Sequence, residues 1–279
     1  MRYTIYNKTC EDMSDIESES ISTIFTSPPY AIAKDYGDTG GIGMSDNINA
    51  YKEYIDRMTN VFKECYRVIQ PGRHIGVNIA DIIQSDKYGS EKKPIRFHYF
   101  NIMRKAGFEY LDVICWKKPD GMGTQKRFGV FIQNPYPTYY RPNNIYEPIL
   151  LFKKPGNIEL TKEQKELNKL KWEDFRRYQT DIWEITPETG VEHPAPFPWK
   201  LPYIFYQLYS LKDEIVLDPF MGSGSSMLAA RKLRRHCIGY EINPDYIEMI
   251  MRRVGFANKG QSTMELFGIS NDDIFEVKK

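Results

Sequence analysis

The stretch that decides the fold is VLDPFMGSGSS, residues 216–226. It starts as a short apolar strand, continues into a turn of glycines and serines, and ends in residues that can open a helix. Because glycine lacks a Cβ, the backbone of such a turn can approach a ligand closely, and the following helix offers unpaired N–H groups. The pattern therefore predicts a ligand-binding loop between a buried strand and a helix.

Two common phosphate-binding loops do not match this stretch. A P-loop requires Lys and then Ser or Thr after its second glycine, whereas Ser225 and Ser226 follow Gly224 here. A dinucleotide-binding loop requires a further Gly or Ala at the place held by Met227. Glu241, 17 positions after Gly224, can accept both hydroxyls of a ribose, although a structural turn followed by a helix-capping Glu explains the pattern equally simply.

Short apolar segments with polar or turn boundaries are typical of buried parallel strands. They occur at residues 22–25, 74–79, 149–153 and 214–217, with a fifth at 236–240. Helices are predicted at residues 51–68, where the Pro71-Gly72 turn stops the apolar spacing, and at residues 225–235. This alternation predicts a Rossmann-like, doubly wound α/β sheet that binds ligands at the carboxyl ends of its strands. Residues 117–141 and the helix-like stretch 161–178 fall outside the alternation, so we expect them to form an added lobe.

The charge is unevenly distributed along the 279 residues, although the net charge is only +1. Residues 116–177 hold 13 Lys and Arg against 7 Asp and Glu. Tyrosines 136, 139, 140 and 146 are interleaved with this basic region. Such a region can follow a phosphate backbone and stack on bases, or it can be a solvated helix with loops.

Other features exclude several classes of protein. No apolar stretch approaches the roughly 20 residues of a membrane span, and the opening residues lack the layout of a signal peptide, so we expect a soluble, cytoplasmic protein. The four cysteines are far apart in the sequence, and we expect reduced thiols and no metal site.

A second loop follows the predicted strand at residues 22–25 and reads Thr26-Ser27-Pro28-Pro29-Tyr30. Two consecutive prolines fix φ and donate no hydrogen bonds, which makes the loop stiff and holds its carbonyls in set directions. The Ser27 hydroxyl and the Pro28 carbonyl could accept hydrogen bonds from an exocyclic amino group, and Tyr30 could stack on a base turned out of its duplex. A rigid surface turn is the simpler alternative.

Taken together, these motifs resemble the amino-methyltransferases of restriction-modification systems. The resemblance rests on SPPY at 27–30, HPAPFP at 193–198, DPFMGSG at 218–224 and GYEIN at 239–243. It extends to YRVIQPGR at 66–73, IAD at 79–81 and YEP at 146–148, and covers most of residues 20–253. Because the catalytic loop precedes the cofactor loop, the chain resembles the permuted β class, and not the release-factor or RNA methyltransferases with the opposite order.

The resemblance implies an S-adenosyl-L-methionine site and a region that recognises double-stranded DNA. Residues implied at the cofactor are Thr26, His193, Pro194, Asp218, Phe220, Gly222, Ser223, Gly224, Ser225, Glu241 and Asn243. The expected DNA contacts are Lys117, Lys118, Lys126, Arg127, Tyr139, Tyr140 and Arg141. Many relatives carry Gly-Asp where this chain has Asn7-Lys8, which leaves the contact to the cofactor adenine unassigned.

The implied organisation has four parts. Residues 1–116 form the catalytic part, and residues 117–190 form an inserted target-recognition region that a core strand near 146–154 interrupts. Residues 191–258 form the cofactor-binding part and residues 259–279 a C-terminal tail. A monomer or a homodimer is expected, with a cognate restriction endonuclease as a further partner.

The choice of base rests on Ser27. In this family, Ser at the first position of the tetrapeptide is commoner in enzymes that methylate N4 of cytosine, and Asp in those that methylate N6 of adenine. We therefore expect N4-cytosine transfer, with N6-adenine as the alternative. Thr, Glu, Ile and His precede the four cysteines, so the Pro-Cys nucleophile of carbon-5 enzymes does not occur. A catalytically silent nucleic-acid-binding module and an enzyme acting on RNA or protein are further alternatives.

Overall fold

A central β-sheet organises the protein. The computed structural model describes residues 1–29, 48–86, 89–119, 136–137, 144–190, 196–256 and 273–278. Nine strands of these residues form the sheet: β1 (Arg2–Tyr6), β2 (Ile21–Thr26), β3 (Ile69–Asn78), β6 (Glu109–Lys117), β7 (Tyr146–Lys153), β8 (Ile182–Glu184), β9 (Ile215–Asp218), β10 (His236–Tyr240) and β11 (Ile274–Lys278). Their order across the sheet is β11-β1-β10-β9-β2-β3-β7-β6-β8. A separate antiparallel hairpin joins β4 (Ile82–Asp86) to β5 (Gly89–Lys93).

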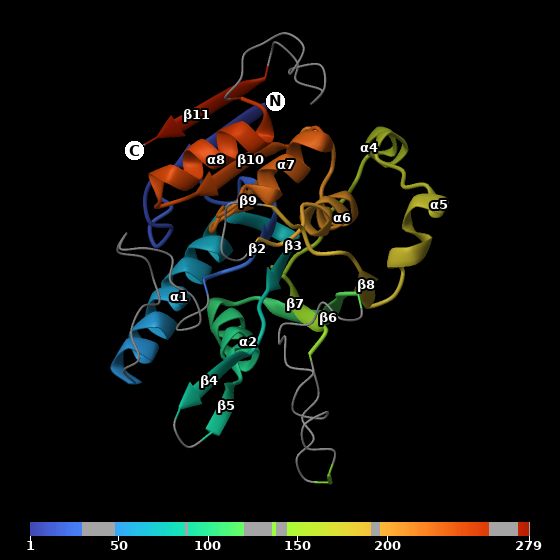
Figure 1. The fold of residues 1–279 in the computed structure, drawn as a ribbon. Helices are drawn as coiled ribbons and strands as arrows, with labels where there is room; N and C mark the ends of the chain where they lie inside the picture. The colour runs from blue at the N-terminus through green and yellow to red at the C-terminus, as the bar shows by residue number, and fades with distance from the viewer. Residues whose placement is uncertain are drawn as a thin grey trace.

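Helices cover both faces of the sheet (Figure 1). One face packs against α1 (Ile48–Val68) and α2 (Ile95–Ala106), and the other against α6 (Lys200–Tyr209), α7 (Ser225–Lys232) and α8 (Pro244–Val254). The strands separate the two cores because their side chains alternate, so that Val216 faces the α6–α8 side and Leu217 the α1–α2 side. The predicted doubly wound α/β architecture is thereby confirmed.

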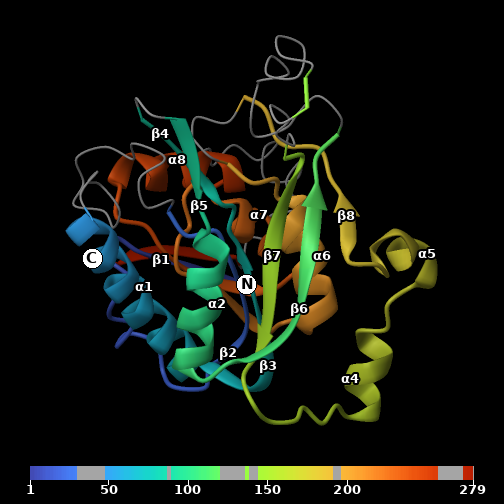
Figure 2. The same ribbon diagram turned by 90° about the horizontal axis from the view of Figure 1, so that it is seen from below.

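The strand direction changes between β3 and β7. From β11 to β3 all neighbouring strands are parallel, whereas β7 runs antiparallel to both β3 and β6. Figure 2 shows β7, β6 and the short β8 side by side at this end of the sheet. The prediction of a parallel strand at residues 149–153 is therefore wrong in direction and right in position. A strand that is buried on both faces has the same apolar pattern in either direction.

One predicted helix ends early, and another predicted helical stretch is divided. The helix expected at residues 225–235 stops at Lys232, because Arg234 adopts a left-handed φ of 55° that turns the chain into β10. The stretch 161–178 divides into α4 (Lys162–Leu167), α5 (Trp172–Phe175) and the 3₁₀ turn η1 (Arg176–Tyr178). Thr161 and Gln164 form a capping box at the start of α4, which satisfies its first N–H groups.

Two further segments differ from the sequence pattern. Helix α1 ends at Val68, as predicted, but the Pro71-Gly72 pair lies within β3, where Gly72 takes a φ of +78°. Residues 274–278, in the predicted tail, form β11 beside β1 in the central sheet. The division of the chain into catalytic, target-recognition and cofactor-binding parts stays a prediction.

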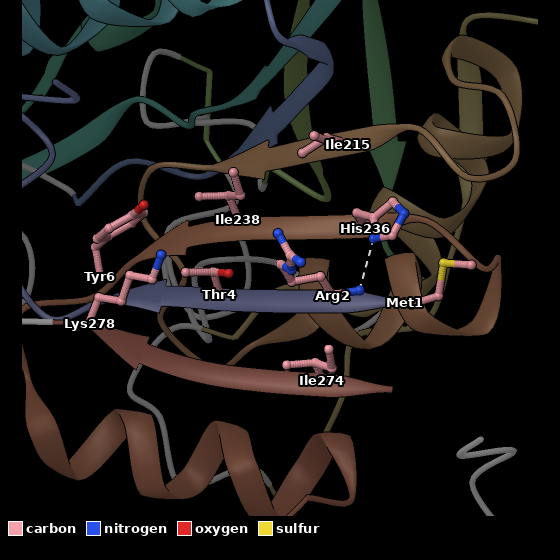
Figure 3. A pocket seen from close by; sticks show the side chains of 9 residues that line it. All are labelled: Met1, Arg2, Thr4, Tyr6, Ile215, His236, Ile238, Ile274 and Lys278. Atoms are coloured by element: carbon pink, nitrogen blue, oxygen red, sulfur yellow. Dashed lines mark hydrogen bonds between the residues drawn. The ribbon is translucent and has the colours of Figure 1, made fainter. Parts of the chain in front are cut away.

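A hollow of about 560 Å³ lies along the face of β11, β1, β10 and β9, at the β11 end of the sheet. Figure 3 shows Arg2, Thr4 and Ile238 among the side chains that line it, with the Arg2 amide donating to Nδ1 of His236 at 2.8 Å. None of its lining residues belongs to the predicted site, so this hollow is separate from the ligand-binding loops.

None of the helices formed by the described residues is long and apolar enough to cross a lipid bilayer.

Candidate active site

The proline loop, the glycine loop and the segment that carries Glu241 leave from one edge of the sheet. Strands β10, β9 and β2 are parallel neighbours, so their carboxyl ends meet at the same edge. Residues 27–29 follow β2, residues 219–224 follow β9, and Glu241 follows β10. The structure therefore brings the proline loop and the glycine loop together, as expected for a site at the strand ends of an α/β sheet.

Asp218 ties the two loops together from beneath. Its fully buried carboxylate accepts hydrogen bonds from Thr26 Oγ1 at 2.6 Å, Ser226 Oγ at 2.5 Å and the Phe220 amide at 3.0 Å. Burial raises the pKa of Asp218 to about 7, although all three hydrogen bonds favour its ionised form. Asp218 and Thr26 are thus bonded to each other below the loops, and their predicted contact with a cofactor stays a prediction.

The glycine loop has a tight backbone course. Gly222 and Gly224 have φ values of +50° and +77°, which residues other than glycine rarely adopt. The loop is closed by hydrogen bonds from the Met221 amide to the Tyr240 carbonyl at 3.0 Å and from the Gly224 amide to the Met221 carbonyl at 2.9 Å. A Cβ on Gly224 would lie 2.9 Å from Cγ2 of Ile250, so helix α8 leaves no room for a side chain there.

Glu241 lies at the rim of the glycine loop. Its carboxylate, only 9% exposed, accepts from the Gly222 amide at 2.9 Å and the Asn243 amide at 2.9 Å. Burial raises the pKa of Glu241 to about 7 against the effect of these two bonds. Since a carboxylate has about four lone-pair sites, Glu241 retains capacity for further donors such as the hydroxyls of a ribose.

Asn7 and Asn243 hold the turn that carries Glu241. The Asn7 amide group donates to the carbonyls of Glu241 at 2.8 Å and Ile242 at 3.1 Å. The Asn243 side chain accepts from the Asp245 amide at 3.0 Å and caps α8, so its side-chain oxygen is engaged by the helix. A cofactor contact by Asn243 stays a prediction.

An arginine of α8 fixes the glycine loop from outside, which the motifs did not predict. Arg253 Nη1 donates to the Ser223 carbonyl at 2.9 Å, to Ser223 Oγ at 2.8 Å and to Ser225 Oγ at 3.0 Å. Its other terminal nitrogen pairs with Glu188, which also accepts from the Trp199 amide at 3.2 Å. Ser225 Oγ donates to the Phe197 carbonyl at 2.6 Å. These bonds join the loop to the chain on both sides of residues 191–195.

The proline loop is held on its other side by helix α1. Pro28 is buried, Ser27 and Pro29 are half-buried, and the Tyr54 hydroxyl donates to the Pro29 carbonyl at 2.9 Å. Tyr54 also was not among the predicted site residues. Of the predicted site, Tyr30, His193 and Pro194 lie outside the described residues.

The predicted DNA contacts are described only in part. Lys126, Arg127, Tyr139, Tyr140 and Arg141 lie outside the described residues. At the end of β6, Lys118 is 8% exposed and pairs with Glu147, and Lys117 reaches Glu184 at 3.4 Å from a more exposed position. Any contact of Lys118 with DNA would therefore have to compete with its pairing to Glu147.

Comparison with known proteins supplies the family. Residues 21–252 match the DNA methylase family that groups N6 and N4 methyltransferases. The Type II beta methyltransferase M.BslI of Bacillus sp. (strain NEB-606) is 31% identical over 250 residues, which are 86% of this chain. The chain spans only 26% of that relative. The Type II methyltransferase M.MthZI of Methanothermobacter thermautotrophicus is 27% identical, with 90% of this chain and 76% of the relative covered.

The fold also has solved counterparts. A crystal structure of TTHA0409 from Thermus thermophilus, in complex with S-adenosyl-L-methionine, superposes with a TM-score of 0.77. The match has 24% identity and covers 99% of this chain and 98% of the other. The family match over residues 21–252 includes both loops and the strands that carry them. The chain therefore belongs to the family of N6/N4 DNA methylases, which are S-adenosylmethionine-dependent amino-methyltransferases.

Proposed function

We propose that this protein transfers a methyl group from S-adenosyl-L-methionine to the exocyclic N4 of cytosine at a specific site in duplex DNA. The observation that carries the proposal is the adjacency of two loops on the neighbouring strands β2 and β9, joined by the hydrogen bond from Thr26 to Asp218. One loop offers hydrogen-bond acceptors for an amino group, and the other offers a glycine turn for a cofactor, with Glu241 from the end of β10 bonded to it.

The residues of the glycine loop suit the cofactor. When bound, S-adenosylmethionine supplies a methyl group made electrophilic by its sulfonium. Glu241 would accept the ribose hydroxyls, because its carboxylate already faces the Gly222 amide and keeps lone pairs free. Phe220, Gly222, Ser223, Gly224 and Ser225 would contact the adenosyl and methionine parts. His193 and Pro194 would line the methionine end, next to the segment that Arg253 and Glu188 hold.

The proline loop would orient the base. The Ser27 hydroxyl and the Pro28 carbonyl would accept hydrogen bonds from the two amino hydrogens, which turns the nitrogen lone pair toward the methyl group. Tyr30 would stack on the base after it leaves the duplex, as enzymes that modify bases require. The chain would form no covalent bond to the base, and its main contribution would be position and direction.

Cytosine is proposed over adenine because Ser27, and not Asp, opens the tetrapeptide. The alternative is N6-adenine transfer by the same loops. The basic stretches 117–141 and 155–187 would contact phosphates and read base edges in the major groove. Since the relatives are named Type II methyltransferases, we further propose that the protein acts in the cytoplasm beside a cognate restriction endonuclease.

The test is methylation of duplex DNA by the purified protein with methyl-labelled S-adenosylmethionine, followed by digestion to nucleosides and mass spectrometry. Labelled 4-methylcytosine is the expected product. Labelled 6-methyladenine would support methyl transfer at this site but contradict the inference of cytosine from Ser27. Absence of label on DNA of varied sequence would favour RNA or protein substrates, or a silent binding module.

A matched pair of variants tests the site itself. Ser27→Ala removes one acceptor and should lower the rate by about 100-fold, with S-adenosylhomocysteine affinity unchanged by calorimetry. Ser20→Ala is the control, because the Ser20 hydroxyl bonds only to Glu17 among the described residues, ahead of β2. Equal rates for the two variants would contradict the role of Ser27.

A further inference from the structure

Two buried tyrosines reach the proline loop from the α1–α2 side of the sheet. Tyr54 on α1 is 2% exposed, and Tyr99 on α2 is completely buried. The Tyr54 hydroxyl lies 2.9 Å from the Pro29 carbonyl oxygen and 2.5 Å from the Tyr99 hydroxyl. The proline loop is thus bonded directly to α1 and, through Tyr54, indirectly to α2.

The direction of these hydrogen bonds follows from their atoms. A carbonyl oxygen can only accept, so the Tyr54 hydroxyl gives its single proton to Pro29. The Tyr54 oxygen must then accept from the Tyr99 hydroxyl. The result is a directed chain from Tyr99 through Tyr54 to Pro29, in which each bond polarises the next.

The loop is consequently fixed at both ends. On one side, Thr26 donates to the buried Asp218 at 2.6 Å. On the other side, the Pro29 carbonyl is held by Tyr54. Ser27 and Pro28 lie between the two attachments. The proline rings fix φ, each proline restricts ψ of the residue before it, and the bond to the Pro29 carbonyl restrains ψ at Pro29.

We propose that Tyr54, supported by Tyr99, is a positioning residue for methyl transfer. It keeps the acceptors at Ser27 and Pro28 in place through its hydroxyl, which bonds to the Pro29 carbonyl and to Tyr99. The inference rests on the proposed function of the proline loop. Acceptors that must meet both hydrogens of one amino group tolerate little displacement, and an error of about 1 Å can cost roughly 100-fold in rate.

The hydroxyl can be separated from the ring by substitution. Tyr54→Phe keeps the buried ring and removes only the donor to Pro29, and Tyr99→Phe removes the donor to Tyr54 while leaving the Tyr54–Pro29 bond. Tyr51→Phe is the matched control one turn earlier on α1, since the Tyr51 hydroxyl has no hydrogen-bond partner among the described residues.

The experiment measures single-turnover methylation of a duplex on which the wild type is active, together with KM for S-adenosylmethionine and calorimetric affinity for S-adenosylhomocysteine. Tyr54→Phe should slow the reaction by about 10- to 100-fold and leave both cofactor constants within about twofold. Tyr99→Phe should slow it by about threefold or more, since the remaining bond is weaker. Tyr51→Phe should match the wild type.

The outcomes separate this inference from the proposed function. If the wild type is active and Tyr54→Phe and Tyr99→Phe both retain its rate, the positioning role is wrong and the proposed function stands. A parallel loss of rate and cofactor affinity would show a general structural effect and would also overturn it. If Tyr54→Phe fails to fold, the rate of Tyr99→Phe decides whether the positioning role is retained or rejected. A wild type without activity on any DNA overturns the proposed function, and this inference with it.

Discussion

Arg253 and Glu188 form a largely buried ion pair that joins helix α8 to the segment ahead of α6, and Arg253 also holds two serines of the glycine loop. We expect Arg253→Lys and Glu188→Gln each to weaken binding of S-adenosylhomocysteine by about tenfold, because an ammonium cannot replace the forked guanidinium and a neutral amide cannot replace the carboxylate that pairs with it. The double variant should lose little more than either single variant, since both act through one contact. Titration calorimetry measures all three.

The control for this prediction is the residue before Arg253 on α8. Arg252 is exposed, and Arg252→Lys should bind the ligand as the wild type does. Losses that add up in the double variant would mean that Arg253 and Glu188 act independently.

Cofactor affinity should rise with pH through about 7. Ribose hydroxyls donate to an ionised carboxylate, whereas burial raises the pKa of Glu241 to about 7 in the free protein. Binding should therefore release a proton near this pH, and affinity at pH 8 should exceed that at pH 6 by about tenfold. Calorimetry in two buffers of different ionisation enthalpy measures the release. Glu241→Gln should bind more weakly and without this pH dependence; a persisting release would assign the proton to another group.

Stability of the free protein should fall between about pH 5 and pH 7. The pKa values of Asp218 and Glu241 are both raised to about 7 from 3.8 and 4.5. Because the raised pKa favours the protonated folded form, this stabilisation is complete below the unfolded pKa values and is lost as pH rises through 7. Since one pH unit is worth about 1.4 kcal/mol for each group in this range, the combined loss is on the order of 4–5 kcal/mol.

Urea unfolding at pH 5 and pH 7.5 measures this loss. Glu241→Gln keeps a neutral group at one of the two sites and should reduce the difference between the two pH values. A wild type more stable at pH 7.5 than at pH 5 would argue against neutral carboxyls at this edge of the sheet.

Gly224→Ala should be costlier than Gly190→Ala. Both glycines have a φ of +77°, so both variants carry a left-handed strain of about 1–2 kcal/mol. At Gly224 the new Cβ would lie 2.9 Å from Cγ2 of Ile250, whereas at Gly190 no atom of the described residues lies within 4 Å. We expect a further loss of about 1–3 kcal/mol in urea unfolding, and loss of cofactor binding, for Gly224→Ala alone. Equal losses would show that α8 yields to the extra methyl group.

The sequence predicted those elements that carry their own signal. Strands β2, β9 and β10 and helix α1 were identified to within three residues, because short apolar runs and helical spacing reflect burial directly. Helices α2, α6 and α8 have no counterpart among the predicted elements. The direction of β7 could not be derived either, since its residues are apolar on both faces.

The same division holds for the candidate site. Ser27, Gly222 and Gly224 stand in motifs whose proline and glycine content has a conformational meaning. Tyr54 and Arg253 carry no such signal. Their contacts to Pro29 and Ser223 span 25 and 30 residues, and they exist only once α1 and α8 have packed on the sheet. Side chains that support a loop from another element require the tertiary structure to be found.

The bond between Thr26 and Asp218 joins positions 192 residues apart. Contacts of such long range are costly to close and form late when a chain folds. Neither segment of the chain holds a complete site alone, so a fragment that ends before β9 would carry the proline loop without its partner. The pairing of β2 with β9 thus makes the site depend on both halves of the chain: a fragment cut before β9 could not bring the two loops together.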